Sequence, residues 1–332
     1  MKIFVIGDHL TGTGPSNVTA KYIEGLNGRC MKQIFRSRAL RAAEMILKIP
    51  FSKVILCSGY SAQNVMAMKI ARFWKRKCAY LMHGCVEHEN RINHCEDPVM
   101  TAVERQTLLL ADKILAVSDV FAAWLKENYP EYRDKIVSMP NGADKSDIND
   151  HTGSYDIKRD YNMILSIGGG MPRKRIVNIC KAVKGLKEDP KYKDLYLTVI
   201  GDKGADSDKI NSYPFVENKG IVSHEEAVRL MRKAGMFIQN SSFETFGLAP
   251  LEALNEGCDI LLSSNVGAIS LFKEIDDRYI IRDCEDIEEI KEKIRNLTGE
   301  HNNTVLLSNI DKGSASWERR TKELSDLLMT LI

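Results

Sequence analysis

Two glutamates with a short fixed spacing are the residues of this sequence best suited to hold a polar ligand. Glu244 and Glu252 have seven residues between them in "SSFETFGLAPLEALNEG", residues 241–257. The apolar run before them predicts a strand over 235–240, and Pro250 suits the first turn of a following helix, where a proline's missing N–H is not needed. The two carboxylates therefore flank a helix N-terminus, whose unpaired amides attract anions.

The turn between the glutamates, residues 245–248, supplies backbone amides at this approach, and Gly247 would let a ligand come close. The alternative is structural. In that case Glu252 stabilises the helix dipole and Glu244 is a surface residue of the loop.

A second candidate site is "SIGGGMPRKR", residues 166–175. A strand ends there in three glycines, and Arg173, Lys174 and Arg175 are then expected to open a helix. Exposed glycine amides and fixed positive charge together predict a phosphate site. The P-loop pattern is absent, and the alternative is a loop with a solvated basic cap.

Two N-terminal segments carry weaker signals. The glycines of "GDHLTGTGPSN", residues 7–17, do not fit the dinucleotide fingerprint, so we expect only a loop that faces a ligand cleft. The His and Cys residues of "LMHGCVEHENRINHC", residues 81–95, match no structural zinc spacing, so we expect no metal there. His83 alone directly follows an apolar strand, where a side chain meets a ligand.

Short apolar runs alternate with helical patterns along the chain, which predicts parallel β-sheets in two α/β domains, residues 1–150 and 151–315. Strands are expected at 2–6, 53–57, 79–82, 113–117, 135–139, 163–168, 195–201, 235–240 and 259–264. Helices are expected at 16–26, 61–75, 102–112, 175–188, 223–234 and 249–257. The segment 316–332 predicts an amphipathic helix that could pack on either domain, including back on the first.

The composition favours an intracellular globular protein. At 332 residues the chain suits two domains, and it contains no apolar run of about 18 residues that could span a membrane. The N-terminus is typical of a first strand and not of an export signal, and the eight cysteines form no CxxC pair. We therefore expect reduced thiols and a cytoplasmic location.

Basic residues are concentrated near the N-terminus, although the net charge is only +2. Residues 21–77 contain 13 Lys and Arg against two Glu. Either these residues form solvated helix faces, or they form a surface for anionic lipid on the inner membrane leaflet, with Phe73 and Trp74 as interfacial anchors. No nucleic-acid motif accompanies the charge, so nucleic acid is not the expected partner.

Together these segments resemble retaining glycosyltransferases of family four, including those that build bacterial polysaccharides. That family has the GT-B fold, two doubly wound Rossmann-like α/β domains that face a central cleft. Glu244 and Glu252 resemble its Glu-x7-Glu motif, and "GGGMPRK" takes the place of its phosphate motif. "SMPNGAD" (138–144), "ADKILAVSDVFAAWL" (111–125) and residues 220–257 are also similar to family segments.

The resemblance assigns roles to the charged positions. It implies that Glu252 accepts hydrogen bonds from the ribose of a nucleotide-sugar and that Glu244 accepts them from the transferred sugar. It also implies that Arg173 and Lys174 neutralise the leaving diphosphate, with neither a metal ion nor another cofactor. His83 would contact the donor sugar near its sixth carbon and could assist through its backbone carbonyl.

Other matching positions are implied to line the donor. Gly12 and Gly14 would lie on the diphosphate or acceptor side, and the base would lie against the loop 220–223. The expected donor-binding residues, besides those named above, are Gly12, Gly14, Gly168, Gly169, Val222, Thr245, Phe246, Gly247 and Leu248.

The function expected from the resemblance is transfer of a sugar from a nucleotide-diphosphate sugar to a glycan or lipid-linked acceptor. The expected donor is a UDP-sugar. Alternatives are a non-catalytic partner subunit of the same fold, and an epimerase or phosphorylase of that fold. The sequence departs from the family pattern in two respects used below. Gly169 stands where an arginine is frequent, and Asp259 stands where a proline is usual.

Overall fold

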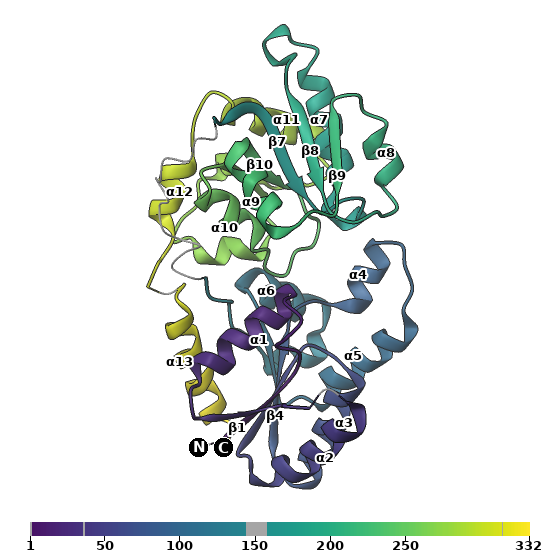
Figure 1. Ribbon diagram of the computed structural model, residues 1–332, viewed down its shortest axis with the longest axis vertical. Coiled ribbons are helices and arrows are strands. Elements are labelled where there is room, and N and C mark those ends of the chain that lie inside the picture. The colour runs from purple at the N-terminus through teal and green to yellow at the C-terminus, as the bar shows by residue number, and fades with distance from the viewer. Residues whose placement is uncertain (1, 36, 144–157, 314) are drawn as a thin grey trace. The chain divides into compact units, whose positions relative to one another are not determined.

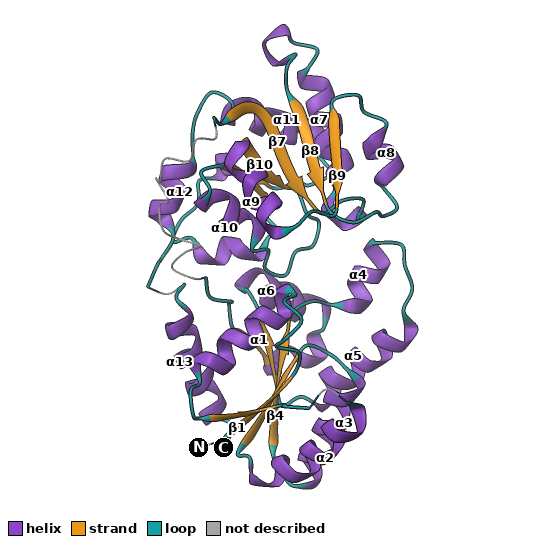
Figure 2. Ribbon diagram, in the orientation of Figure 1, coloured by secondary structure: helices purple, strands orange, loops and turns teal. Residues whose placement is uncertain are grey.

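The computed structural model describes residues 2–35, 37–143, 158–313 and 315–332 (Figure 1). Its contacts divide the chain into two compact units. The first comprises Met1–Asn90, Glu96–Asp144 and Gly313–Ile332, and the second comprises Arg91–Cys95 and Lys145–Lys312. The predicted boundary at 150 lies outside the described residues. Each unit contains one sheet with helices packed around it (Figure 2).

The sheet of the first unit has six parallel strands in the order β2-β1-β3-β4-β5-β6. Their bounds are β1 Ile3–Ile6, β2 Cys30–Lys32, β3 Val54–Ser58, β4 Lys77–Met82, β5 Lys113–Ala116 and β6 Ile136–Ser138. The central strands are apolar and almost wholly buried, which is why their sequences predicted them. The short edge strand β2 was not predicted, because three residues of mixed polarity carry no periodic signal.

The helices of this region begin where polar side chains can cap them. Thr13, Ser37, Ser61 and Ser118 each accept a hydrogen bond from an amide in the first turn of the helix that follows. The helices are α1 Gly14–Gly25, α2 Arg38–Lys48, α3 Ala62–Phe73, α4 Val86–Ile92, α5 Pro98–Leu110 and α6 Asp119–Asn128. The last helix of the chain, α13 (Trp317–Met329), lies beside α1 in the first unit (Figure 1).

The second unit has its own six parallel strands in the order β12-β11-β10-β7-β8-β9. Their bounds are β7 Asp160–Ile167, β8 Tyr196–Ile200, β9 Val216–Gly220, β10 Ala234–Gln239, β11 Asp259–Ser263 and β12 Ile280–Ile281. The helices are α7 Ile176–Leu186, α8 Ser207–Asn211, α9 His224–Lys233, α10 Ala249–Asn255, α11 Ile287–Leu297 and α12 Asn303–Asn309. The prediction of two parallel α/β sheets is confirmed.

The strand order fixes where each unit can bind a ligand. In the first sheet the order reverses between the neighbours β1 and β3, and in the second sheet it reverses between β7 and β10. Helices that leave two such neighbours run to opposite faces of the sheet and leave a crevice at the carboxyl ends of the strands. The loops after β1 and β3, and those after β7 and β10, are therefore the places to look for a site.

One property bears on the membrane. Within the described ranges, none of the helices combines the length and the apolar character needed to cross a bilayer.

Candidate functional site

The loop after β10 holds Glu244 in a fixed position. The carbonyl of Glu244 accepts the Gly267 N–H at 3.0 Å, and the carbonyl of Phe246 accepts the Ala268 N–H at 2.6 Å. The Phe246 ring is buried in the core of the unit. These contacts tie the loop to the segment after β11, so the carboxylate of Glu244 projects from a rigid support.

Three donors converge on that carboxylate. Lys174 Nζ forms an ion pair with Glu244 Oε2, Arg173 Nη1 lies 3.3 Å from the same oxygen, and Gln239 Nε2 donates to it at 2.9 Å. Only 12% of the Glu244 side chain is exposed. Burial alone would raise the pKa of Glu244, but the charges and hydrogen bonds of Lys174 and Arg173 outweigh burial and lower it. These contacts hold Lys174 and Arg173 in fixed positions, where their positive charges would favour an anionic ligand.

Both cations lie in a short 3₁₀ turn, Pro172–Lys174, and not at the start of a helix. Arg175 adopts a left-handed conformation with φ of 51°, and α7 begins only after it, at Ile176. The basic run therefore opens the helix only through Arg175, its N-cap residue, and this left-handed residue separates Arg173 and Lys174 from α7. The turn directs Lys174 back across the end of β7, where a Cβ on Gly168 would collide with its side chain.

The glycines after β7 do not present free amides. Gly168 and Gly169 donate their N–H groups to the Ile200 carbonyl at 2.8 and 3.0 Å. A side chain at Gly169, whose φ is +55°, would overlap the carbonyl of Asp202. The prediction that these amides face a phosphate is wrong, since the carbonyl of Ile200, the last residue of β8, already accepts both of them. The glycines instead let two loops pack closely, and that packing positions Lys174.

Glu252 lies in the first turn of α10 and Pro250 lies in the same turn, as predicted. Gly247 has φ of +82°, a conformation that favours glycine, at the approach to this helix. α10 has only seven residues, so its dipole is small and the attraction for an anion rests on Arg173 and Lys174. Val222 is half-buried in the loop between β9 and α9, also in the second unit.

In the first unit, His83 follows β4 and joins a buried chain of hydrogen bonds. Its Nε2 lies 2.8 Å from Ser58 Oγ, which lies 2.6 Å from Thr19 Oγ1, and Thr19 donates its own proton to the Pro15 carbonyl. The three side chains therefore form a continuous hydrogen-bonded chain from α1 to the residue after β4. Burial lowers the pKa of His83 to about 4, so the ring is neutral at pH 7.

His83 lines a cavity of about 1000 Å³ formed wholly by first-unit residues. Thr13 is in the wall, whereas its neighbours Gly12 and Gly14 are not. Sequence reasoning missed Ser58 and Gln33, which also line the cavity. The signal for Ser58 was present, because "SGYS", residues 58–61, directly follows an apolar strand predicted at 53–57.

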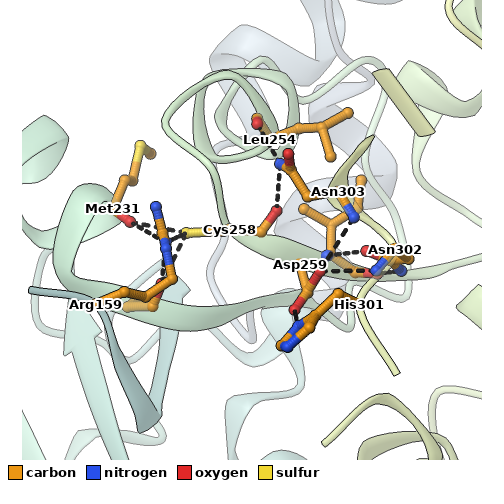
Figure 3. A network of polar contacts seen from close by, with 10 residues as sticks. Arg159, Met231, Leu254, Cys258, Asp259, His301, Asn302 and Asn303 are labelled. Atoms are coloured by element: carbon orange, nitrogen blue, oxygen red, sulfur yellow. Dashed lines mark hydrogen bonds and ion pairs between the residues drawn. The ribbon is translucent and has the colours of Figure 1, made fainter. Parts of the chain in front are cut away.

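Asp259, where the family pattern has a proline, has a structural role in the second unit (Figure 3). Its carboxylate accepts the Asn302 N–H at 2.8 Å, the Asn303 N–H at 3.0 Å and a hydrogen bond from His301 Nδ1 at 2.7 Å. These contacts fasten the start of α12 to the first residue of β11. The departure therefore concerns the framework and does not touch Glu244 or Lys174.

No group of three His, Cys, Asp or Glu side chains that could hold a metal ion occurs in the residues that the structure covers.

Comparison with known proteins shows which families and solved structures this chain is similar to. A family model described as "Glycosyl transferases group 1" matches residues 147–303, a stretch that belongs to the second unit. No match was found among curated proteins. The similar solved structures include Anabaena HepE in complex with UDP and glucose, with 13% identity and a TM-score of 0.67, covering 99% of this chain and 100% of HepE.

Two further structures are similar over nearly their whole length. WaaG, a glycosyltransferase involved in lipopolysaccharide biosynthesis, has 14% identity and a TM-score of 0.63, and 99% of each chain is covered. WaaB, a lipopolysaccharide outer core galactosyltransferase, has 15% identity and a TM-score of 0.63, and both chains are covered fully. At these identities the likeness shows the fold, which is GT-B. Together with the family model, it supports a glycosyltransferase.

Proposed function

We propose that this chain is a retaining, metal-independent glycosyltransferase that moves a sugar from a nucleotide-diphosphate sugar to a glycan or lipid-linked acceptor. The observation that carries the proposal is the cluster of Glu244, Lys174 and Arg173 at the switch point between β7 and β10. HepE has been crystallised with UDP and with UDP-glucose, which supports a UDP-sugar as donor.

The chemistry of the cluster suits this reaction. Breaking a sugar–phosphate bond builds negative charge on the diphosphate, and the preorganised cations Lys174 and Arg173 would stabilise that charge. Glu244 would accept hydrogen bonds from the sugar hydroxyls, and Glu252 would accept them from the ribose. Fixed cations fill the electrostatic role that a metal ion has in other transferases, so we expect turnover to survive chelation by EDTA.

The remaining positions have supporting roles in the proposal. The turn 245–248 would contact sugar and phosphate, and Val222 would lie near the base. Gly168 and Gly169 enter only through the placement of Lys174. The first unit would hold the acceptor, with His83 beside the donor sugar, Gly12 in the loop before α1 and Gly14 as the first residue of α1.

The test is a thermal-shift and turnover screen of the purified chain against UDP-, GDP- and ADP-sugars. Lys174→Ala and Glu244→Ala should each lower kcat/KM by roughly 10²–10³-fold, because each removes a preorganised charge. Glu288→Ala, whose side chain is 78% exposed on α11, is the matched control and should keep full activity. Normal rates in both site variants would show the site assignment to be wrong.

Product analysis separates the reaction types. A transferase consumes donor only when acceptor is present, apart from slow hydrolysis, whereas an epimerase converts the donor alone. The anomeric configuration of the product, read by proton NMR, tests retention. An absence of turnover with every donor and acceptor would favour a non-catalytic partner subunit.

The first unit carries a surface suited to an anionic membrane. The outward side of α2 and the neighbouring ends of α3 and the 3₁₀ turn Ile49–Phe51 expose apolar side chains, which we call the α2 surface. Phe51 is 79% and Phe73 80% exposed. The α2 surface consists of Leu40, Ala43, Ile46, Leu47, Phe51, Phe73 and Trp74.

Exposed aromatic and aliphatic groups beside basic residues are typical of peripheral membrane helices. We propose that the α2 surface docks on anionic lipid, which would place the protein in the cytoplasm at the inner leaflet. Flotation should recover the chain with vesicles containing anionic lipid and not with neutral ones. Phe51→Ser with Phe73→Ser should reduce recovery, whereas Val305→Ser, an exposed apolar residue of α12, should not. Equal recovery with both lipids would refute docking.

A further inference from the structure

The cavity of the first unit is lined by many polar side chains. It lies at the carboxyl ends of four neighbouring strands, with Gly7 after β1, Gln33 after β2, Ser58 at the end of β3 and His83 after β4. This is the switch point of the first sheet, where a crevice is expected.

Three helix N-termini form part of the cavity wall. α1, α2 and α3 have 12, 11 and 12 residues, and their first turns or caps line the cavity through Thr13, Arg38 and Ser61. The positive ends of three helix dipoles therefore meet at one cavity, which favours negative charge there.

A buried donor in the wall has no partner. Gln33 is 3% exposed, and its Nε2 makes no hydrogen bond. A buried amide without a partner loses the hydrogen bonds that it would make to water, which is costly unless a ligand supplies an acceptor. An oxygen atom of a ligand in the cavity could accept a hydrogen bond from Gln33 Nε2.

Two arginines add charge to the same wall. Arg41 donates to the Phe35 carbonyl and to Gln63 Oε1, both at 2.9 Å and both neutral acceptors. In the portion of the chain that the structure covers, neither Arg38 nor Arg41 forms an ion pair with a carboxylate.

The wall contains one acidic residue, Asp8. Its carboxylate accepts the Leu10 N–H at 3.0 Å and the Thr11 hydroxyl, so it is engaged within its own loop. Two arginines against one carboxylate leave the wall with a net positive charge.

We propose that this cavity binds an acceptor that carries an oxyanion, either a phosphate or a carboxylate, beside its sugar hydroxyls. The inference rests on the proposed function, since it takes the first unit as the acceptor side. Arg38 and Arg41 neutralise the oxyanion, and Gln33 donates to an oxygen of the same ligand. His83 lines the cavity too, so the acceptor is held beside the residue proposed to contact the donor sugar.

Calorimetric titration of the full chain with glucose 6-phosphate, glucuronate and glucose tests the inference. At least one of the two acids should bind about tenfold more tightly than glucose, because a charge-assisted hydrogen bond is worth about that factor. The acid that binds more tightly identifies the oxyanion. Equal binding of all three probes, or no binding of either acid, would overturn the proposal.

Variants locate the binding. Arg38→Gln and Arg41→Gln should each lower the affinity for the acid about tenfold and leave the affinity for glucose unchanged. Arg41 also donates to the Phe35 carbonyl, so Arg41→Gln could unsettle the local structure. Arg38 is exposed, so Arg38→Gln is the deciding variant if Arg41→Gln fails to fold. Lys53→Gln, at the amino end of β3, removes a charge outside the cavity and should have no effect. If Arg38→Gln binds the acid with the same affinity as the unaltered chain, the inference is refuted.

Titration of the unaltered chain with UDP keeps the two proposals apart. UDP binding without acid binding would refute the acceptor inference and leave the proposed function standing. Acid binding without binding of any nucleotide would support the oxyanion site and count against the transferase.

Discussion

At the scale of single residues, the ion pair between Lys174 and Glu244 should matter for stability as well as for turnover. Lys174→Met leaves Glu244 largely buried with Arg173 and Gln239 as partners, so we expect a loss of roughly 1.5–3 kcal/mol in unfolding free energy at pH 7. Urea denaturation measures it. Lys209→Met, an exposed change on α8, should cost less than about 0.5 kcal/mol, and an equal loss in both would contradict the assignment.

The ion pair between Lys174 and Glu244 also predicts how the unfolding free energy depends on pH. The pKa of folded Glu244 is below its ordinary value of 4.5, so its contribution is present above that value and is lost as the pH falls through the folded pKa. Unfolding free energy should therefore fall with acidification below about pH 4.5. Glu244→Gln, which cannot titrate, should show a smaller fall. An unchanged acid profile in Glu244→Gln would show that other carboxylates account for it.

Sequence reasoning at this scale identified the residues but not their partners. The spacing of Glu244 and Glu252 and the basic run at 173–175 were sufficient to choose the candidates. The hydrogen-bond partners of the glycine amides could not be predicted from the sequence, because their acceptors, Ile200 and Asp202, lie more than 30 residues further along the chain. A glycine-rich loop looks the same in sequence whether it faces a phosphate or another loop.

At the scale of elements, α4 depends on one buried carboxylate. Glu104 on α5 accepts the Val86 N–H at 3.1 Å and the Glu87 N–H at 3.3 Å, so it caps the helix that follows His83. Burial raises its pKa from an ordinary 4.5 to about 7, against the lowering effect of those amides. A carboxyl with a raised folded pKa contributes stability that is complete below pH 4.5 and is lost as the pH rises through 7.

We therefore expect unfolding free energy to fall between pH 5 and 8, by about 3 kcal/mol at most. Glu104→Gln keeps an oxygen acceptor for the amides but does not titrate, so its stability should change less over this range. Guanidinium denaturation at the two pH values measures the difference. A profile in Glu104→Gln that matches the unaltered chain would contradict the assignment, with Glu89 as the next carboxylate to test.

The start of α12 depends on Asp259 in the same way. Asp259→Ala removes the acceptor of the buried Asn302 amide and of the partly buried Asn303 amide, and should lower unfolding free energy by about 1–3 kcal/mol. Asp259→Asn, which keeps one acceptor oxygen, should restore part of it. The His301 side chain is 63% exposed, so His301→Ala should cost about 0.5 kcal/mol or less. Thermal denaturation followed by circular dichroism measures the stabilities, which should be lowest for Asp259→Ala, higher for Asp259→Asn and highest for His301→Ala.

Elements were predictable where their own residues carried the pattern. The buried runs at β1, β3, β4 and β5 predicted strands because strands buried on both faces are almost continuously apolar. β9 reads "VENKG" and was missed, because it is a polar edge strand defined by its pairing with β8.

At the scale of the whole molecule, the first unit is built from segments at both ends of the chain. Ala143 donates its N–H to the Ala315 carbonyl at 2.8 Å, so the segment that leaves the unit and the segment that returns lie side by side. Trp317 then packs its ring edge-on against Tyr22 of α1, with centroids 5.3 Å apart, and a Cβ on Gly142 would overlap its indole. The return of 316–332 to this unit was one of two alternatives left open by the amphipathic pattern, because such a pattern shows that a helix is covered but not by what.

Trp317→Ala should therefore destabilise the first unit and not the second. Removing the indole from Tyr22 and Gly142 should cost roughly 2–4 kcal/mol. Amide hydrogen exchange read by mass spectrometry reports each unit separately, so peptides of β1, β3 and α1 should exchange faster while those of β7, β8 and β10 keep their rates. Met329→Ala, an exposed change at the end of α13, should alter neither set. Faster exchange throughout both units would mean that they unfold as one, and that α13 stabilises the whole chain through the first unit.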